Sequence, residues 1–123
     1  MIEHNEWREA GGALQRPFYS AIGRILDGDY SAQCPGCGTP ILRFYFHIFD
    51  PDAQTGTMWV WCPTCRVMSH LPRVRPTKGR FSDPYRDLDL DAFAEMELAE
   101  GEPFISRLDR LWDAGVIGLP PTP

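Results

Sequence analysis

The four cysteines constrain the fold of this chain more than any other feature. They form two pairs of equal spacing, Cys34-x-x-Cys37 and Cys62-x-x-Cys65, which 24 residues separate, and the sequence contains no other cysteine. A two-residue spacing lets a tight turn direct both sulfur atoms at one ion, and four thiolates complete a tetrahedral Zn²⁺ site. The sequence therefore predicts one structural zinc ion bound by all four cysteines.

The residues around each pair favour such turns. Proline follows the first cysteine of both pairs, at Pro35 and Pro63, where its fixed φ suits the start of a turn. Gly38 follows the first pair, at a position that often needs a positive φ. Arg66 occupies the matching position after the second pair, which predicts that the second turn leaves with ordinary strand geometry.

With these two turns, residues 32–72 resemble the zinc ribbon class. In zinc ribbons, two cysteine turns, called knuckles, lie at the ends of β-hairpins and share one structural zinc. The resemblance implies a small zinc-binding sheet, but it does not imply an activity, because ribbons occur in transcription factors, ribosomal proteins, enzymes and adaptors alike.

Three other interpretations of the cysteines stay open. Two disulfide bonds require an oxidising compartment, and we expect no export signal because the first residues are strongly charged. A redox-active Cys-x-x-Cys is typical of a βαβ context, which the sequence does not predict. The turns are also similar to those of rubredoxins, which bind one redox-active iron, although the second pair lacks the glycine that follows in rubredoxins.

The segment between the pairs has the alternation of β-strands. Ile41 to Phe49 and Thr57 to Trp61 predict a hairpin, and a third strand is predicted from Val67 to Leu71, ended by Pro72. In the first strand Leu42, Phe44, Phe46 and Ile48 share one face, and in the second Met58 and Val60 lie opposite Trp59 and Trp61. Because aromatic residues occupy both faces, we expect the terminal helices to cover both sides of the sheet.

Helical periodicity lies outside the ribbon. A first helix is predicted from about Leu14 to Asp27, with Trp7 docking onto the core, and a second over residues 91–99. A last helix is opened by Pro103 and closed by Gly115, with its apolar stripe toward the core. We expect the opposite face of this helix to carry four charged residues, Arg107, Asp109, Arg110 and Asp113.

Charge is unevenly distributed along the 123 residues, whose net charge is -5. Residues 1–65 sum to -3, residues 66–80 to +5 and residues 81–123 to -7. The basic stretch either pairs with the acidic segment that follows or contacts nucleic-acid phosphates beside aromatic residues that stack on bases. The candidate nucleic-acid residues are Arg66, Arg73, Arg75, Lys78 and Arg80.

Catalysis has little support in the sequence. No Gly-rich phosphate loop, nucleophile elbow or paired helical histidine motif is present, and a zinc ion with four thiolates keeps no open position. His47 and His70 are the candidates for a small polar site if the sheet brings them together with Arg43 or Tyr45.

These observations predict a single α+β domain over residues 1–118, with the ribbon at 32–72 and an extended tail at 119–123. Its architecture is a three-stranded antiparallel sheet packed by one N-terminal and two C-terminal helices. We expect a cytoplasmic protein without membrane contact, because no apolar run approaches about 20 residues.

The leading functional prediction is a non-enzymatic zinc-binding interaction module. Its acidic residues 82–113 would contact a basic protein partner, in an adaptor or immunity role. The bacterial immunity proteins match it in size and charge, without a shared motif. A nucleic-acid-binding ribbon is the alternative, a small enzyme comes third, and the sequence leaves the oligomeric state open.

Overall fold

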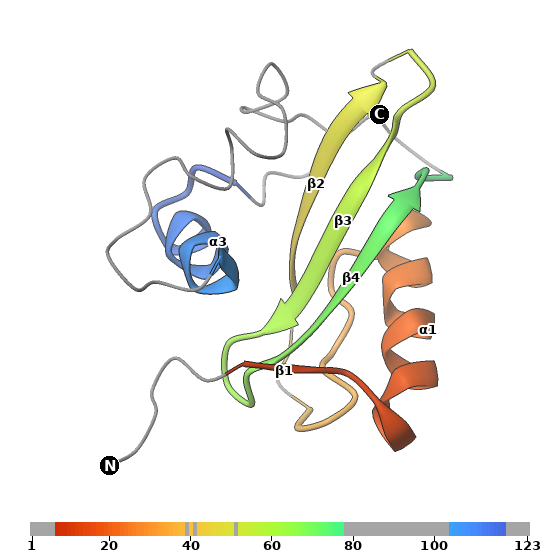
Figure 1. The fold of residues 1–123 in the computed structure, drawn as a ribbon. Helices are drawn as coiled ribbons and strands as arrows, with labels where there is room; N and C mark the ends of the chain where they lie inside the picture. The colour runs from red at the N-terminus through yellow and green to blue at the C-terminus, as the bar shows by residue number, and fades with distance from the viewer. Residues whose placement is uncertain (1–6, 39, 41, 51, 78–103, 118–123) are drawn as a thin grey trace.

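The computed structural model describes residues 7–38, 40, 42–50, 52–77 and 104–117. These residues form an α+β fold in which two helices lie on opposite sides of a twisted four-stranded sheet (Figure 1). The elements are β1 (Arg8–Glu9), a 3₁₀ turn (Gly12–Leu14), α1 (Gln15–Leu26), β2 (Arg43–Asp50), β3 (Thr55–Cys62), β4 (Val67–Val74) and α3 (Phe104–Asp113).

The sequence predicts a purely antiparallel sheet, but the sheet is mixed. Its strand order is β1-β4-β3-β2, with β2, β3 and β4 antiparallel and β1 parallel to β4. The predicted three-stranded meander is therefore present, and a fourth strand is added to its edge. β1 has only two exposed residues, Arg8 and Glu9, so it has no hydrophobic alternation by which the sequence could reveal it.

β4 continues past Pro72 to Val74, so the prediction that proline ends this strand is wrong. The β3–β4 register pairs Met58 with Leu71 and Gly56 with Val74, which leaves two residues of β4 opposite one residue of β3. Pro72 thus lies in a β-bulge, where the ladder is locally interrupted and a missing N–H is tolerated.

The two described helices are close to their predicted positions. α1 ends at Leu26, and Gly28 follows with a φ of 102°. α3 ends at Asp113, and Gly115 follows with a φ of 77°. Glycine adopts this left-handed region without the steric penalty of a side chain, so both helices stop where the sequence predicts. The helix predicted over residues 91–99 lies outside the described residues.

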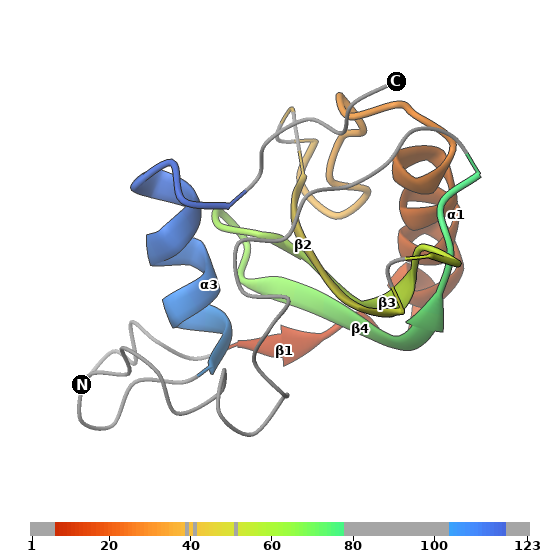
Figure 2. The same ribbon diagram turned by 90° about the horizontal axis from the view of Figure 1, so that it is seen from above.

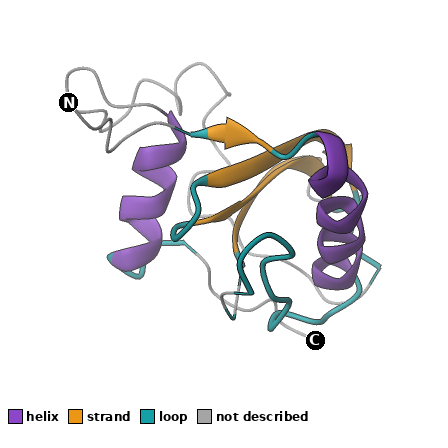
Figure 3. Cartoon of the chain, turned by 90° about the horizontal axis from the view of Figure 1, so that it is seen from below, coloured by secondary structure: helices purple, strands orange, loops and turns teal. Residues whose placement is uncertain are grey.

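The predicted alternation of the strands is confirmed by two separate cores, one on each face of the sheet. Leu42, Phe44, Phe46, Ile48, Met58 and Val60 face α1, where they pack with Phe18, Ile22 and Ile25. Tyr45, Trp59 and Trp61 face α3, where they pack with Ile105, Leu108 and Leu111. The sheet therefore lies between the helices, as Figures 2 and 3 show from above and below.

Polar contacts also hold α3 against the sheet. The Asp109 carboxylate accepts hydrogen bonds of 2.8 Å from Arg43 Nη1 and from the indole N–H of Trp61, and Arg43 also forms an ion pair of 2.9 Å with Asp113. Trp7 docks as predicted, since its indole N–H donates to Ser106 Oγ at 2.8 Å.

The helical periodicity predicts that Arg107 lies on the solvent face of α3, and this prediction is wrong. Its exposed fraction is 0%, and its guanidinium carbon lies 4.6 Å from the centroid of the Phe104 ring. Helical periodicity assigns a charged residue to the solvent side by default, and this arginine is an exception that only packing reveals.

Candidate metal centre

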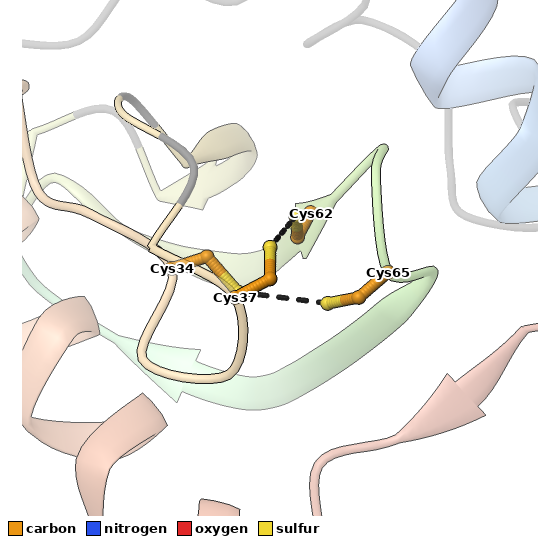
Figure 4. A group of neighbouring side chains, drawn as sticks. All are labelled: Cys34, Cys37, Cys62 and Cys65. Carbon is orange, nitrogen blue, oxygen red and sulfur yellow. Dashed lines mark hydrogen bonds between the residues drawn. The ribbon is translucent and has the colours of Figure 1, made fainter.

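The four cysteines converge at one end of the sheet, although 24 residues of chain separate the pairs (Figure 4). Their sulfur atoms all lie within 4.8 Å of one another. Cys34 Sγ lies 3.6 Å from Cys65 Sγ, and Cys37 Sγ lies 3.5 Å from Cys62 Sγ. Zn–S bonds of about 2.3 Å in a tetrahedron place sulfur atoms about 3.8 Å apart, so the cluster could hold one metal ion.

Each pair is carried by a turn of the same construction. The first knuckle precedes β2, and the second joins β3 to β4. In the first, the Gly38 N–H donates to the Cys34 carbonyl at 2.8 Å, and in the second the Arg66 N–H donates to the Cys62 carbonyl at 3.0 Å. The two turns therefore use equivalent backbone hydrogen bonds.

The prediction that Arg66 leaves its turn with strand geometry is wrong. Its φ is 59°, in the left-handed region that Gly38 also occupies with a φ of 76°. A non-glycine residue pays a penalty of about 1–2 kcal/mol for this conformation. Two contacts offset it: the Arg66 guanidinium carbon lies 5.1 Å from the Trp7 ring centroid, and the Arg66 carbonyl accepts the Arg8 N–H at 3.0 Å.

The cysteines differ in their exposure to solvent. Cys34 and Cys62 are buried, Cys65 is partly buried and Cys37 is exposed. Burial raises the pKa of the Cys34 thiol, and it raises the pKa of Cys65 to about 12. A metal ion binds thiolates, so its binding must displace these protons.

The donor set limits which ions fit. Four sulfur ligands within reach of one another suit a thiophilic ion that accepts tetrahedral geometry, such as zinc or iron. All four cysteines are free, so neither disulfide bond of the alternative interpretation is present in this structure. The Gly36 N–H points at Cys34 Sγ at 3.3 Å, which stabilises a thiolate at that position.

An open groove of about 460 Å³ lies between α1 and the first knuckle. The described residues that line it are Pro17, Ser20, Ala21, Arg24, Gln33, Cys34, Pro35 and Gly38. This lining contains no carboxylate or imidazole. The groove therefore adds no carboxylate or imidazole ligand to the cysteine cluster, and it has no such group to act as a general base.

The predicted histidine site is assembled in part. His47 and His70 lie on the α3 face of the sheet, on either side of Thr57, which pairs with His47 in the β2–β3 register. His47 Nδ1 lies 2.8 Å from the Tyr45 hydroxyl, and His70 Nε2 lies 2.5 Å from Thr57 Oγ1. Arg43 does not join them, since Asp109 and Asp113 hold it.

Thr57 links His70 to the backbone of β4. Its hydroxyl donates to the Leu71 carbonyl at 3.1 Å, and its Oγ1 lies 2.5 Å from His70 Nε2. The His70 ring stacks on Trp59 with centroids 4.5 Å apart, and Trp59 stacks in turn on Tyr45 at 5.9 Å. Partial burial lowers the pKa of His70, and the carboxylate of Glu9 offsets part of this shift. Sequence reasoning did not find Thr57 or this three-ring stack, because both depend on the cross-strand register.

The basic residues do not form one patch. Arg66 lies at the start of β4, beside the metal centre, whereas Arg73 and Arg75 lie at the other end of this strand. At about 3.3 Å per residue, the seven steps from Arg66 to Arg73 span about 23 Å. Lys78 and Arg80 lie outside the described residues.

No family model matches the chain, and no curated protein or solved structure matches it either. Within the part of the chain that the structure describes, no helix is both long and apolar enough to cross a membrane. The site must therefore be interpreted from its own geometry.

Proposed function

We propose that this protein is a non-enzymatic interaction module whose fold depends on one structural zinc ion bound by Cys34, Cys37, Cys62 and Cys65. The convergence of four sulfur atoms within 4.8 Å carries this proposal. We favour zinc over iron because residues 32–72 resemble the zinc ribbon class, and the metal analysis described below separates the two ions.

The position of the cluster supports a structural role. It joins the loop before β2 to the β3–β4 turn, so one ion would hold together the two ends of the chain segment that forms the β2–β3 hairpin. Closing the loop of 24 residues removes entropy from the unfolded chain. Metal binding would therefore contribute directly to the free energy of folding.

A Cys₄ zinc site supports binding better than catalysis. Four protein ligands leave no coordination position for water or substrate, so the ion would not supply a metal hydroxide or a Lewis acid. His47 would act as a packing residue of the α3 face, and His70 as an exposed residue stacked on Trp59; each has a hydrogen-bond partner within the sheet. An enzyme built on this pair stays the third candidate.

The proposed partner is a macromolecule, and the two candidate classes are a basic protein and a nucleic acid. A basic protein would contact the acidic residues 82–113, of which the structure describes only residues 104–113, within α3. There, both aspartates, Asp109 and Asp113, are already paired with Arg43. Nucleic acid would contact the basic residues at the end of β4, where Arg73 and Arg75 are exposed.

Elemental analysis of the purified full chain tests the metal. We expect one zinc per chain, no colour, and loss of the far-ultraviolet circular dichroism of the sheet after removal with a strong chelator. Re-addition of zinc should restore the signal. A red protein with one iron per chain would contradict zinc, and retained structure after complete metal removal would contradict the structural role.

A further inference from the structure

Two β-bulges flank Gly56 at the end of the sheet opposite the metal centre. On the β2 side, Ile48 pairs with Gly56 and Asp50 pairs with Thr55, so Phe49 is the extra residue. On the β4 side, the bulge contains Pro72 and Arg73. Bulges re-aim side chains and are frequent beside functional sites.

The two bulges bring Phe49 and Arg73 together across β3. The Arg73 guanidinium carbon lies 5.4 Å from the centroid of the Phe49 ring, although the two residues belong to strands that are not neighbours. Phe49 is 49% exposed, and it is one of two large hydrophobic side chains exposed among the described residues. The arginine thus orients an aromatic ring that stays open to solvent.

Further groups extend this surface. His70 is exposed and forms the β4 end of the stack that runs through Trp59 to Tyr45. Arg75 is exposed just beyond β4, and neither Arg73 nor Arg75 forms an ion pair with any residue that the structure describes. We call the set Phe49, His70, Arg73 and Arg75 the bulge surface.

Among the described residues, the acidic groups at this end of the sheet are Asp50, at the end of β2, and Asp52, in the β2–β3 connection. Asp50 follows Phe49, but its carboxylate turns into the β2–β3 connection, where it accepts the Ala53 N–H at 3.2 Å. Glu9, on β1, acts on His70 from the opposite edge. Over residues 7–77 the chain has seven arginines against five carboxylates, so this part of the protein is positive although the whole chain is not.

We propose that the bulge surface binds single-stranded nucleic acid, with a base stacked on the open face of Phe49 and phosphates contacting Arg73 and Arg75. An exposed aromatic ring beside exposed arginines provides the two interactions that sequence-tolerant single-strand binding requires. A duplex hides its base faces, so it fits this surface less well. The inference rests on the proposed interaction module and names its partner.

Fluorescence anisotropy with labelled dT20 and U20 and the zinc-loaded full chain tests the inference. Two phosphate contacts predict a slope of log K against log salt of about -1.4, which is about sevenfold weaker binding at 200 mM than at 50 mM salt. Phe49→Ala should weaken binding at least about fivefold without changing this slope. Arg73→Gln, or Arg75→Gln, should reduce the slope by about half.

The matched control is Arg16→Gln, because Arg16 is an exposed arginine on α1, away from the bulge surface. It should leave binding and slope unchanged. Binding that is absent up to about 100 μM, that Phe49→Ala and Arg73→Gln leave intact, or that is equal for a duplex would overturn the inference. Retention of a stoichiometric basic protein after nuclease treatment, unaffected by Arg73→Gln, would also overturn it in favour of a protein partner.

The same samples separate this inference from the proposed function. Zinc content and melting temperature are measured on each preparation before the anisotropy experiment. One zinc per chain without nucleic-acid binding would reject the bulge surface alone. Binding by a chain that folds without metal would reject the structural zinc alone.

Discussion

The two ends of the sheet are built on different principles. At one end, four cysteines on two equivalent turns converge, so that one bound metal ion could cross-link the two turns. At the other end no such ligands occur among the described residues, and two bulges around Gly56 set the geometry. The knuckle end is specified by a few residues of fixed chemistry, whereas the bulge end is specified by close packing of backbones.

The largest difference between the ends should appear when a metal ligand is removed. Cys62→Ser takes away a buried ligand, and structural zinc contributes about 10–16 kcal/mol in small domains, more than most domains have in total stability. We expect an unfolded chain at 25 °C by circular dichroism, with zinc content well below one. Thr64→Ala, an exposed change in the same knuckle, should leave both values unchanged. A folded Cys62→Ser chain would show that the knuckle end does not depend on metal.

Gly56→Ala tests the bulge end and should have the next largest effect. A Cβ atom there would overlap the His47 carbonyl oxygen and approach the His47 carbonyl carbon to 2.9 Å, so β2 and β3 would have to separate. We expect a loss of about 3 kcal/mol in the free energy of unfolding, measured by urea denaturation.

Gly23→Ala is the control for Gly56→Ala. Gly23 lies in α1, and a Cβ atom added there would meet no other group within 4 Å. Alanine should stabilise that helix by about 0.5–1 kcal/mol. Equal effects of the two substitutions would show that the backbones at the bulge end are not closely packed.

A smaller effect is expected at Arg66, where the knuckle end meets β1. Arg66→Ala keeps the left-handed conformation but loses the contact with Trp7, so it should destabilise the protein by about 1 kcal/mol. Arg66→Gly loses the same contact and relieves the backbone strain, so it should be close to neutral. Urea denaturation of both variants measures this difference. If Arg66→Gly is as destabilising as Arg66→Ala, the left-handed conformation of Arg66 does not strain the folded chain.

The sequence predicts well what depends on local pattern. The Cys-x-x-Cys spacing indicated which residues would converge, and the alternation from Leu42 to Ile48 indicated which face each side chain takes. Glycine marked both helix ends. These features follow from residue type and neighbour spacing alone, so no knowledge of the distant chain is needed.

The features that the sequence missed all depend on distant partners. β1 exists because the Arg66 and Met68 carbonyls accept N–H groups from a polar segment about 60 residues earlier. The left-handed conformation of Arg66 depends on Trp7 in the same way, and the meeting of Phe49 with Arg73 depends on two register shifts. No local signal encodes such contacts; the sequence predicts a strand that begins only at Thr57, whereas β3 begins at Thr55 and includes Gly56.

The smallest expected effect is the pH dependence contributed by His70, beside the bulge end. Its pKa in the folded protein lies below the ordinary value near 6.5, chiefly because the exposed ring is still partly desolvated, so the unfolded chain binds this proton more tightly. Protonation of His70 therefore favours the unfolded chain. The free energy of unfolding keeps its full value above pH 6.5 and declines as the pH falls from there toward the folded pKa. Urea denaturation between pH 5 and pH 7.5 should show this decline, and His70→Gln should flatten it. An unchanged pH profile in His70→Gln would mean that other groups control this range, and that the stack on Trp59 leaves the imidazole as well solvated as in the unfolded chain.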